Sequence, residues 1–173
     1  NKKAAMRLLD EAIKNVPDDP ELIYSEVLLL DPYQDKDKLD KLLKKLLEIE
    51  PNSPTYLNAY AYTLALQNRR LDEARQYVEH ALEFAPDQAS ILDTLGYITF
   101  LQNDFKTSAL VLEKAYEISQ NVKIGVRYAK SLYMQGDLTK FNHVLQQLQK
   151  KHPNDPQLEQ LKSLLLPPHM KKS

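Results

Sequence analysis

Prolines recur at a nearly constant spacing along this chain of 173 residues. Four of them end an apolar, helix-like stretch and precede Asp or Asn, and these are Pro17, Pro51, Pro86 and Pro153. Their spacings are 34, 35 and 67 residues, and the skipped position in the last interval falls at Gln120. Self-similarity with a period of about 34 residues predicts a repeat architecture, in which one structural unit stacks on the next.

Within each period, small or apolar residues recur at fixed distances before the proline. Five residues before it stand Ala12, Leu46, Ala81, Ala115 and Leu148. Twelve residues before it stand Ala5, Leu39, Ala74, Ser108 and Phe141. Small side chains let two helices approach closely, because a large one would overpack the contact at a cost of about 1–3 kcal/mol. The apolar spacing is helical throughout and only three glycines are present, so we predict an all-α fold without strands.

The unit at 89–120 carries the clearest pattern. Its Leu95-Gly96, its turn Asn103-Asp104-Phe105 and its Ala115 resemble the corresponding positions of the tetratricopeptide repeat (TPR) family. The resemblance extends over nearly the whole chain. It implies a right-handed superhelical solenoid of antiparallel helix pairs, in which the first helices of successive repeats line a concave face.

We therefore expect one solenoid domain over 1–173, with about four repeats. Its parts are a leading half repeat at 2–19, repeats at 20–53, 54–88, 89–121 and 122–155, a capping helix at 156–166 and a flexible tail at 167–173. The half repeat indicates that the chain begins inside a repeat. We expect the charged segment 31–38 to form a loop, and Leu158, Leu161 and Leu165 to share one face of the capping helix.

Enzymatic motifs are missing from the sequence. The chain has no GxGxxG, Walker, GxSxG or HExxH pattern, no cysteine, and no histidine with a partner at metal-ligand spacing. We expect no enzyme activity, no cofactor and no metal. The net charge of -1 argues against nucleic acid as a partner. The alternatives are a regulatory or assembly segment of a larger enzyme, and a nucleic-acid-binding α-solenoid.

The resemblance predicts a protein-interaction scaffold that binds a peptide or helix of a partner in the concave groove, within a multiprotein assembly. The groove positions it implies are Asn58, Tyr62, Asp93, Tyr97, Phe100, Lys123, Arg127, Lys130 and Tyr133. Three of them are cations at i, i+4 and i+7 on one side of one helix, and residues 121–173 carry a net charge of +6. A partner with an acidic segment fits this cluster, whereas a solvated basic face and aromatic packing between repeats are the alternatives.

The N-terminal edge is a second candidate surface. Leu8, Leu9 and Ile13 lack part of their cover in a half repeat, so they could pair with upstream repeats or with a second copy in a homodimer. No run of 18 apolar residues is present, so we expect no direct membrane insertion. The stretch 56–97 resembles bacterial envelope TPR lipoproteins, which favours the periplasm or envelope over the cytoplasm.

Overall fold

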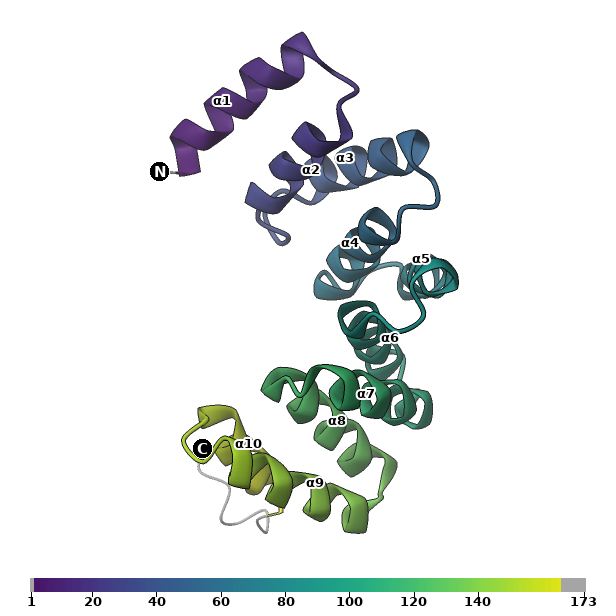
Figure 1. Ribbon diagram of the computed structural model, residues 1–173, viewed down its shortest axis with the longest axis vertical. Helices are drawn as coiled ribbons and strands as arrows, with labels where there is room; N and C mark the ends of the chain where they lie inside the picture. Colours follow the sequence, from purple (N-terminus) through teal and green to yellow (C-terminus); the bar gives the residue numbers. More distant parts are fainter. Residues whose placement is uncertain (1, 166–173) are drawn as a thin grey trace. The chain divides into compact units, whose positions relative to one another are not determined.

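The computed structural model describes residues 2–165 of the chain, and within this range it contains ten α-helices and no strand (Figure 1). The helices are α1 (Lys2–Asn15), α2 (Pro20–Leu29), α3 (Lys36–Ile49), α4 (Pro54–Leu66), α5 (Leu71–Phe84), α6 (Ala89–Leu101), α7 (Phe105–Ser119), α8 (Val122–Gln135), α9 (Leu138–Lys151) and α10 (Pro156–Leu164). The helices pack in consecutive pairs, so the prediction of an all-α fold built from helix pairs is confirmed.

Local sequence signals set the ends of these helices. Asp19 caps α2, because its Oδ1 accepts hydrogen bonds from the backbone N–H groups of Glu21 and Leu22 at 2.9 and 3.0 Å. Asn121 caps α8 in the same way, and its Oδ1 accepts from the N–H of Lys123 at 2.9 Å. Gly136 ends α8 with a φ of 89°, a conformation that glycine adopts without steric cost.

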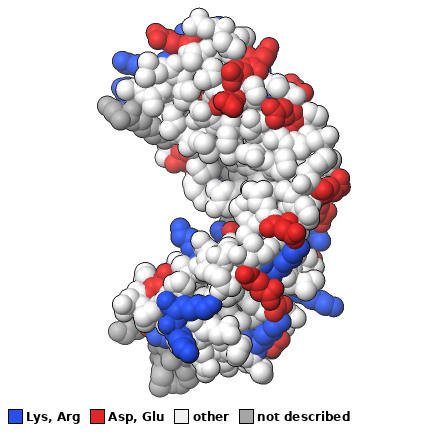
Figure 2. Space-filling view, in the orientation of Figure 1, with Lys and Arg blue, Asp and Glu red and all other residues white. Residues whose placement is uncertain are grey.

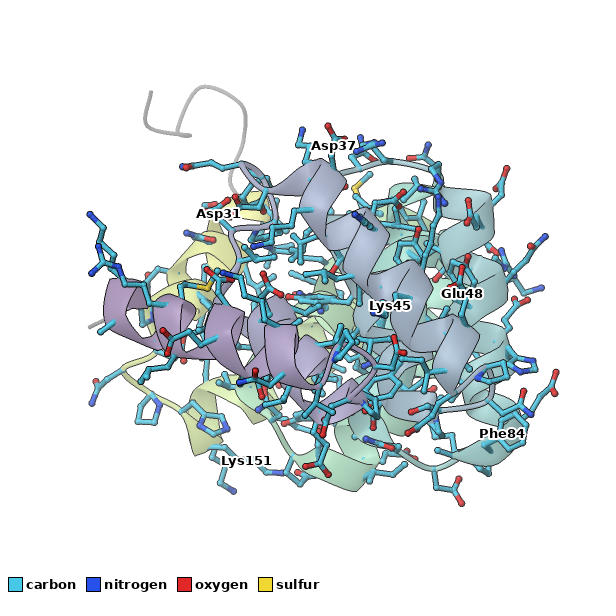
Figure 3. All side chains as sticks on the ribbon, turned by 90° about the horizontal axis from the view of Figure 1, so that it is seen from above. Asp31, Asp37, Lys45, Glu48, Phe84 and Lys151 are labelled. Carbon is cyan, nitrogen blue, oxygen red and sulfur yellow. The ribbon has the colours of Figure 1, made fainter. Side chains whose placement is uncertain are left out.

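The chain divides between Pro86 and Asp87 into two compact units, α1–α5 and α6–α10. In the α1–α5 unit, α2 packs on α1 and α3, and α4 packs on α3 and most extensively on α5. Three fully buried alanines, Ala61, Ala74 and Ala81, allow the close contact of α4 with α5. Figure 3 shows Asp37 and Phe84 on the outside of this unit, where both side chains are exposed.

In the α6–α10 unit, α7 packs between α6 and α8, and α10 packs on α8 and α9. Glycine is required at the first contact, because a Cβ on Gly96 would lie 2.3 Å from Cγ of Leu112. Ser108 replaces the usual small apolar residue in α7 and is fully buried. Its hydroxyl donates to the backbone oxygen of Gly96 at 2.7 Å and lies 2.8 Å from the hydroxyl of Ser131, so it joins α7 to α6 and α8.

Two boundaries differ from the predictions. Helix α3 begins at Lys36, so 31–38 is not wholly a loop. Asp31 closes a tight turn, because its Oδ1 accepts from the N–H groups of Tyr33 and Gln34 at 2.8 and 3.0 Å, and the next helix can start early. At the other end, α10 buries Leu158 and Leu161, while Leu165 follows the helix and is exposed. Residue 166 of the expected capping helix and the expected tail 167–173 lie outside the described residues.

The hydropathy of the helices shows whether any of them could cross a membrane. Within residues 2–165, no helix combines the length and the apolar character that crossing a membrane requires.

Candidate functional site

A small pocket of about 150 Å³ opens on helices α6, α7 and α8. Its lining consists of Gly96, Tyr97, Phe100, Leu112, Arg127, Lys130 and Ser131, and we call it the α6–α8 pocket. The missing side chain at Gly96 lets Leu112 pack against the backbone of α6 and form the apolar floor. Four of the groove positions that the TPR resemblance implies, Tyr97, Phe100, Arg127 and Lys130, meet here.

Arg127 is held in place on the wall of the pocket. Its Nη1 donates to Oδ2 of Asp93 at 2.7 Å, and its guanidinium carbon lies 4.6 Å from the centre of the Tyr97 ring. A cation over an aromatic face contributes about 0.5–1 kcal/mol at an exposed site and more when it is desolvated. The ion pair and the ring together fix the orientation of the guanidinium, so it is a rigid part of the site.

Asp93 lies under this arrangement and is largely buried. Burial raises the pKa of its carboxyl group above the usual range, although the charge of Arg127 and its hydrogen bond act in the opposite direction. Its second oxygen, Oδ1, is buried and accepts no hydrogen bond from the described residues. A carboxylate with one oxygen unsatisfied depends strongly on its one cationic partner.

Lys130, unlike Arg127, has no acidic partner in the described part of the chain. It lines the pocket and is half-buried, and it forms no ion pair with any residue in the described range. Lys123, about two turns earlier on α8, is exposed and has no ionic partner among residues 2–165 either. Because α8 carries three cations and no acid, these two lysines present positive charge that the described chain does not neutralise.

The other implied groove positions lie in different surroundings. The hydroxyl of Tyr133 donates to the backbone oxygen of Leu164 at 3.1 Å, so this residue anchors α10 and does not line the pocket. Asn58 and Tyr62 belong to α4 in the α1–α5 unit. The side-chain oxygen of Asn58 is buried without a partner among the described residues, and Tyr62 is 36% exposed.

On the N-terminal edge, Leu8 of α1 is 68% exposed, whereas Leu9 and Ile13 are partly covered. Of the three residues predicted for this surface, Leu8 therefore offers the largest exposed apolar fraction.

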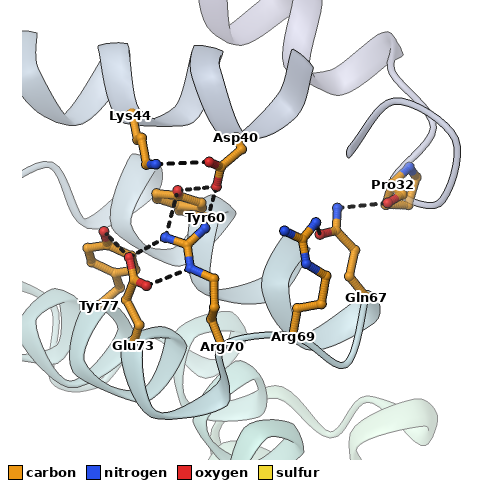
Figure 4. Close-up of polar contacts among 9 residues, drawn as sticks. All are labelled: Pro32, Asp40, Lys44, Tyr60, Gln67, Arg69, Arg70, Glu73 and Tyr77. Carbon is orange, nitrogen blue, oxygen red and sulfur yellow. Dashed lines mark hydrogen bonds and ion pairs between the residues drawn. The ribbon is translucent and has the colours of Figure 1, made fainter. Parts of the chain in front are cut away.

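A polar network in the α1–α5 unit was not foreseen from the sequence (Figure 4). Asp40 of α3 accepts hydrogen bonds from the hydroxyl of Tyr60 and, at 2.6 Å, from Nη1 of Arg70. Arg70 also donates from Nε to Glu73 at 2.6 Å, and Glu73 accepts from Tyr77 at 2.8 Å. The network links α3, α4 and α5. Its members come from α3, α4, α5 and the residue before α5, Arg70, without a common spacing, so no sequence pattern predicts the network.

Burial alone would raise the pKa of Asp40, but hydrogen bonds from Tyr60, Lys44 and Arg70 outweigh it and lower the pKa to about 2. The network therefore keeps the Asp40 carboxylate ionised, and this carboxylate connects the neighbouring helices. Across residues 2–165, no group of His, Asp or Glu side chains is arranged to hold a metal ion.

Two curated proteins resemble the chain in sequence, and no protein-family model matches it. The TPR repeat-containing protein PA4667 of Pseudomonas aeruginosa is 31% identical over 113 residues, which cover 65% of this chain and 19% of that protein. Protein O-mannosyl-transferase Tmtc2 of Drosophila melanogaster is 30% identical over 97 residues, which cover 54% of this chain and 10% of that protein. The chain thus spans a fifth or less of the length of these relatives.

Solved structures share the fold over most of the chain. MamA from Desulfovibrio magneticus RS-1 has a TM-score of 0.77 at 18% identity, covering 89% of this chain and 88% of its own. TTC0263, a TPR protein of Thermus thermophilus, has a TM-score of 0.72 at 20% identity, with 96% and 91% covered. PilF of Pseudomonas aeruginosa has a TM-score of 0.74 at 14% identity, with 94% of this chain and 90% of its own covered.

The period of about 34 residues, the consecutive helix pairs and these likenesses agree with one another. The chain has the fold of tetratricopeptide-repeat proteins, and proteins of this kind typically mediate protein–protein interactions.

Proposed function

We propose that the chain is a protein-interaction scaffold, and that the α6–α8 pocket holds a side chain from a peptide or helix of a partner protein within a multiprotein assembly. The observation that carries the proposal is the meeting of an apolar floor, two aromatic walls and an unneutralised lysine, Lys130, in one pocket. Aromatic and arginine side chains around a small pocket are the usual anchors of protein interfaces.

The size of the pocket favours a protein partner over a small molecule. Sites for cofactors and metabolites usually enclose about 300–1,000 Å³. The α6–α8 pocket, at about 150 Å³, is too small for such a ligand and suits a single side chain. A partner would gain the rest of its contact area from the surrounding helix faces. Tyr62 stands 35 residues before Tyr97, at the same place in the preceding repeat, and we propose it as a second contact of the same kind.

A pull-down with site variants tests this proposal. Lys130→Glu reverses the charge at the pocket, and Lys150→Glu makes the same change at a position of α9 that is not in the pocket lining. The bait is the whole chain, mixed with a lysate of the organism that makes it. We expect at least one partner to bind the wild type and Lys150→Glu and to be lost from Lys130→Glu.

A second variant, Tyr97→Ser, removes one aromatic wall. Thermal unfolding of each bait shows whether it is folded, so a lost partner cannot be confused with a lost fold. A partner set unchanged in both Lys130→Glu and Tyr97→Ser would contradict the proposal. Arg127→Glu is less suitable, because it would also break the ion pair with Asp93.

A further inference from the structure

The residues of the α6–α8 pocket indicate which kind of partner segment would bind there. This inference rests on the proposed function. The floor and walls are largely apolar, and Leu112, Tyr97 and Phe100 are the apolar and aromatic side chains that line them. The pocket has a volume of about 150 Å³. One apolar side chain fills such a space, and an aromatic ring stacks well against Tyr97 and Phe100.

The charge beside the pocket comes from α8. Lys123, Arg127 and Lys130 lie on one side of this helix, and α8 contains no acid. Arg127 already pairs with Asp93, so Lys130 and Lys123 are the two cations of the row that have no ionic partner in the described structure. Figure 2 shows Lys and Arg side chains over the α6–α10 unit, interspersed with Asp and Glu side chains. A partner segment that lies along α8 therefore meets positive charge.

The spacing of the two lysines limits what can neutralise them. Seven residues of helix advance about 10 Å along the axis. When both lysine side chains extend straight out from the helix, their ammonium groups are about this far apart, and a lone C-terminal carboxylate then contacts only one of them. An extended segment advances about 3.3 Å per residue, and about three residues therefore span the two lysines.

From these relations we infer that the α6–α8 pocket selects an internal segment of a partner in which an apolar, preferably aromatic, side chain is followed or preceded within about three residues by at least two acidic side chains. The ring fills the pocket, one carboxylate reaches Lys130, and another reaches Lys123. Asp93 keeps Arg127 occupied and thus restricts the acidic contacts to the two lysines at either side of it.

Random peptides displayed within a phage coat protein, without a free C-terminus, provide the probe. Selection is carried out against the whole wild-type chain, Lys130→Glu and the matched control Lys150→Glu. We expect the wild type and the control to enrich an aromatic residue with Asp or Glu within three positions, and Lys130→Glu to lose the preference for acids. A capped synthetic peptide from the enriched set should bind about tenfold more weakly when its acids become Asn and Gln, and the difference should shrink at high salt.

Other outcomes separate this inference from the proposed function. Enriched peptides that depend on Tyr97 but lack acids would overturn the acidic segment and leave the proposed function standing. Enrichment only from a second library with free C-termini would show that a terminal carboxylate is the ligand, and would also overturn the inference. Peptides that bind Tyr97→Ser and Lys130→Glu as well as the wild type, or no enrichment from either library, would contradict both.

Discussion

Arg127 of α8 and Asp93 of α6 form an ion pair with an Nη1–Oδ2 distance of 2.7 Å, and the two residues are 34 positions apart in the sequence. That separation equals one repeat period, so they occupy the same place in successive first helices. The contact joins two neighbouring repeats inside the α6–α10 unit and at the same time places a guanidinium over Tyr97. Stability and the shape of the candidate site are therefore linked through one side chain.

Removing the acid should destabilise the chain. In Asp93→Ala, Arg127 keeps its partly buried position without its carboxylate partner, and we expect the free energy of unfolding to fall by about 1–3 kcal/mol. Urea unfolding at pH 7 measures the change. The control is Asp87→Ala, which removes an exposed acid paired with Lys114 and should cost less than about 1 kcal/mol. Equal effects of the two substitutions would show that the buried pair has no special role.

The network around Asp40 predicts a dependence of stability on acid pH. Its pKa is lowered to about 2, below the ordinary value of 3.8, so the folded state favours the ionised form. This contribution is present above the ordinary pKa and is lost as the pH falls from about 4 through 2. It amounts to at most about 2.5 kcal/mol, because the pKa falls from 3.8 to about 2 and one pKa unit corresponds to about 1.4 kcal/mol.

Asp40→Asn removes that contribution and offers the test. The difference in unfolding free energy between about pH 5 and about pH 2.5, which bracket most of this loss, should be smaller in Asp40→Asn than in the wild type. Asp37→Asn, at an exposed position of the same helix, should leave the difference unchanged. The same pH dependence in all three proteins would contradict the structural role of the network.

Gly96 allows the floor of the pocket to form. In Gly96→Ala the new Cβ would lie 2.3 Å from Cγ of Leu112, so the leucine must move. Overpacking costs about 1–3 kcal/mol, and the higher helix propensity of alanine offsets up to about 1 kcal/mol of it, so we expect a net loss of about 1–2 kcal/mol.

A double-mutant cycle with Leu112→Ala measures the coupling between the two positions. If the clash explains the loss, the double variant is less destabilised than the sum of the single variants predicts. Additive effects would mean that the two side chains do not compete for the same space.

Leu8 on α1 tests the expected self-association. If copies pair through this face, the mass measured by light scattering should rise with concentration for the wild type and not for Leu8→Glu. Leu110→Glu is the matched control, because Leu110 is also 68% exposed but belongs to α7. A monomer at every concentration, or an equal loss of association in the control, would exclude the face around Leu8 as the contact.

Much of the fold followed from the sequence, because it depends on periodic features. The prolines mark the repeat junctions, and small residues such as Ala61, Gly96 and Ala115 mark the close helix contacts. The start of α3 at Lys36 was not predicted. The side chain of Asp31 accepts a hydrogen bond from the backbone of Tyr33 and makes the preceding turn short. The charged residues of this segment gave no sign of that contact.

Only part of the candidate site could be predicted from the sequence. The first-helix positions of Tyr97, Phe100 and Lys130 could be placed from the repeat register alone. Leu112 and Ser131 were not recognised as lining residues, since they also serve the packing between helices. The Asp93–Arg127 pair could have been found, because opposite charges one period apart on successive first helices lie close in such a fold. Tyr133 was expected to be a groove position, and its hydrogen bond to Leu164 could not be predicted, because that contact depends on where α10 ends.

Photo-crosslinking from the pocket tests the central claim most directly. A benzophenone side chain replaces Phe100 in the whole chain, and in the control it replaces Phe84, an exposed phenylalanine of α5 in the other unit. After irradiation in the lysate, mass spectrometry identifies the attached proteins. We predict a partner that is crosslinked from Phe100, absent from the Phe84 control, and lost when Lys130→Glu is added. The same adducts from both positions, or adducts from the Phe100 position that persist with Lys130→Glu, would contradict the pocket as the binding site.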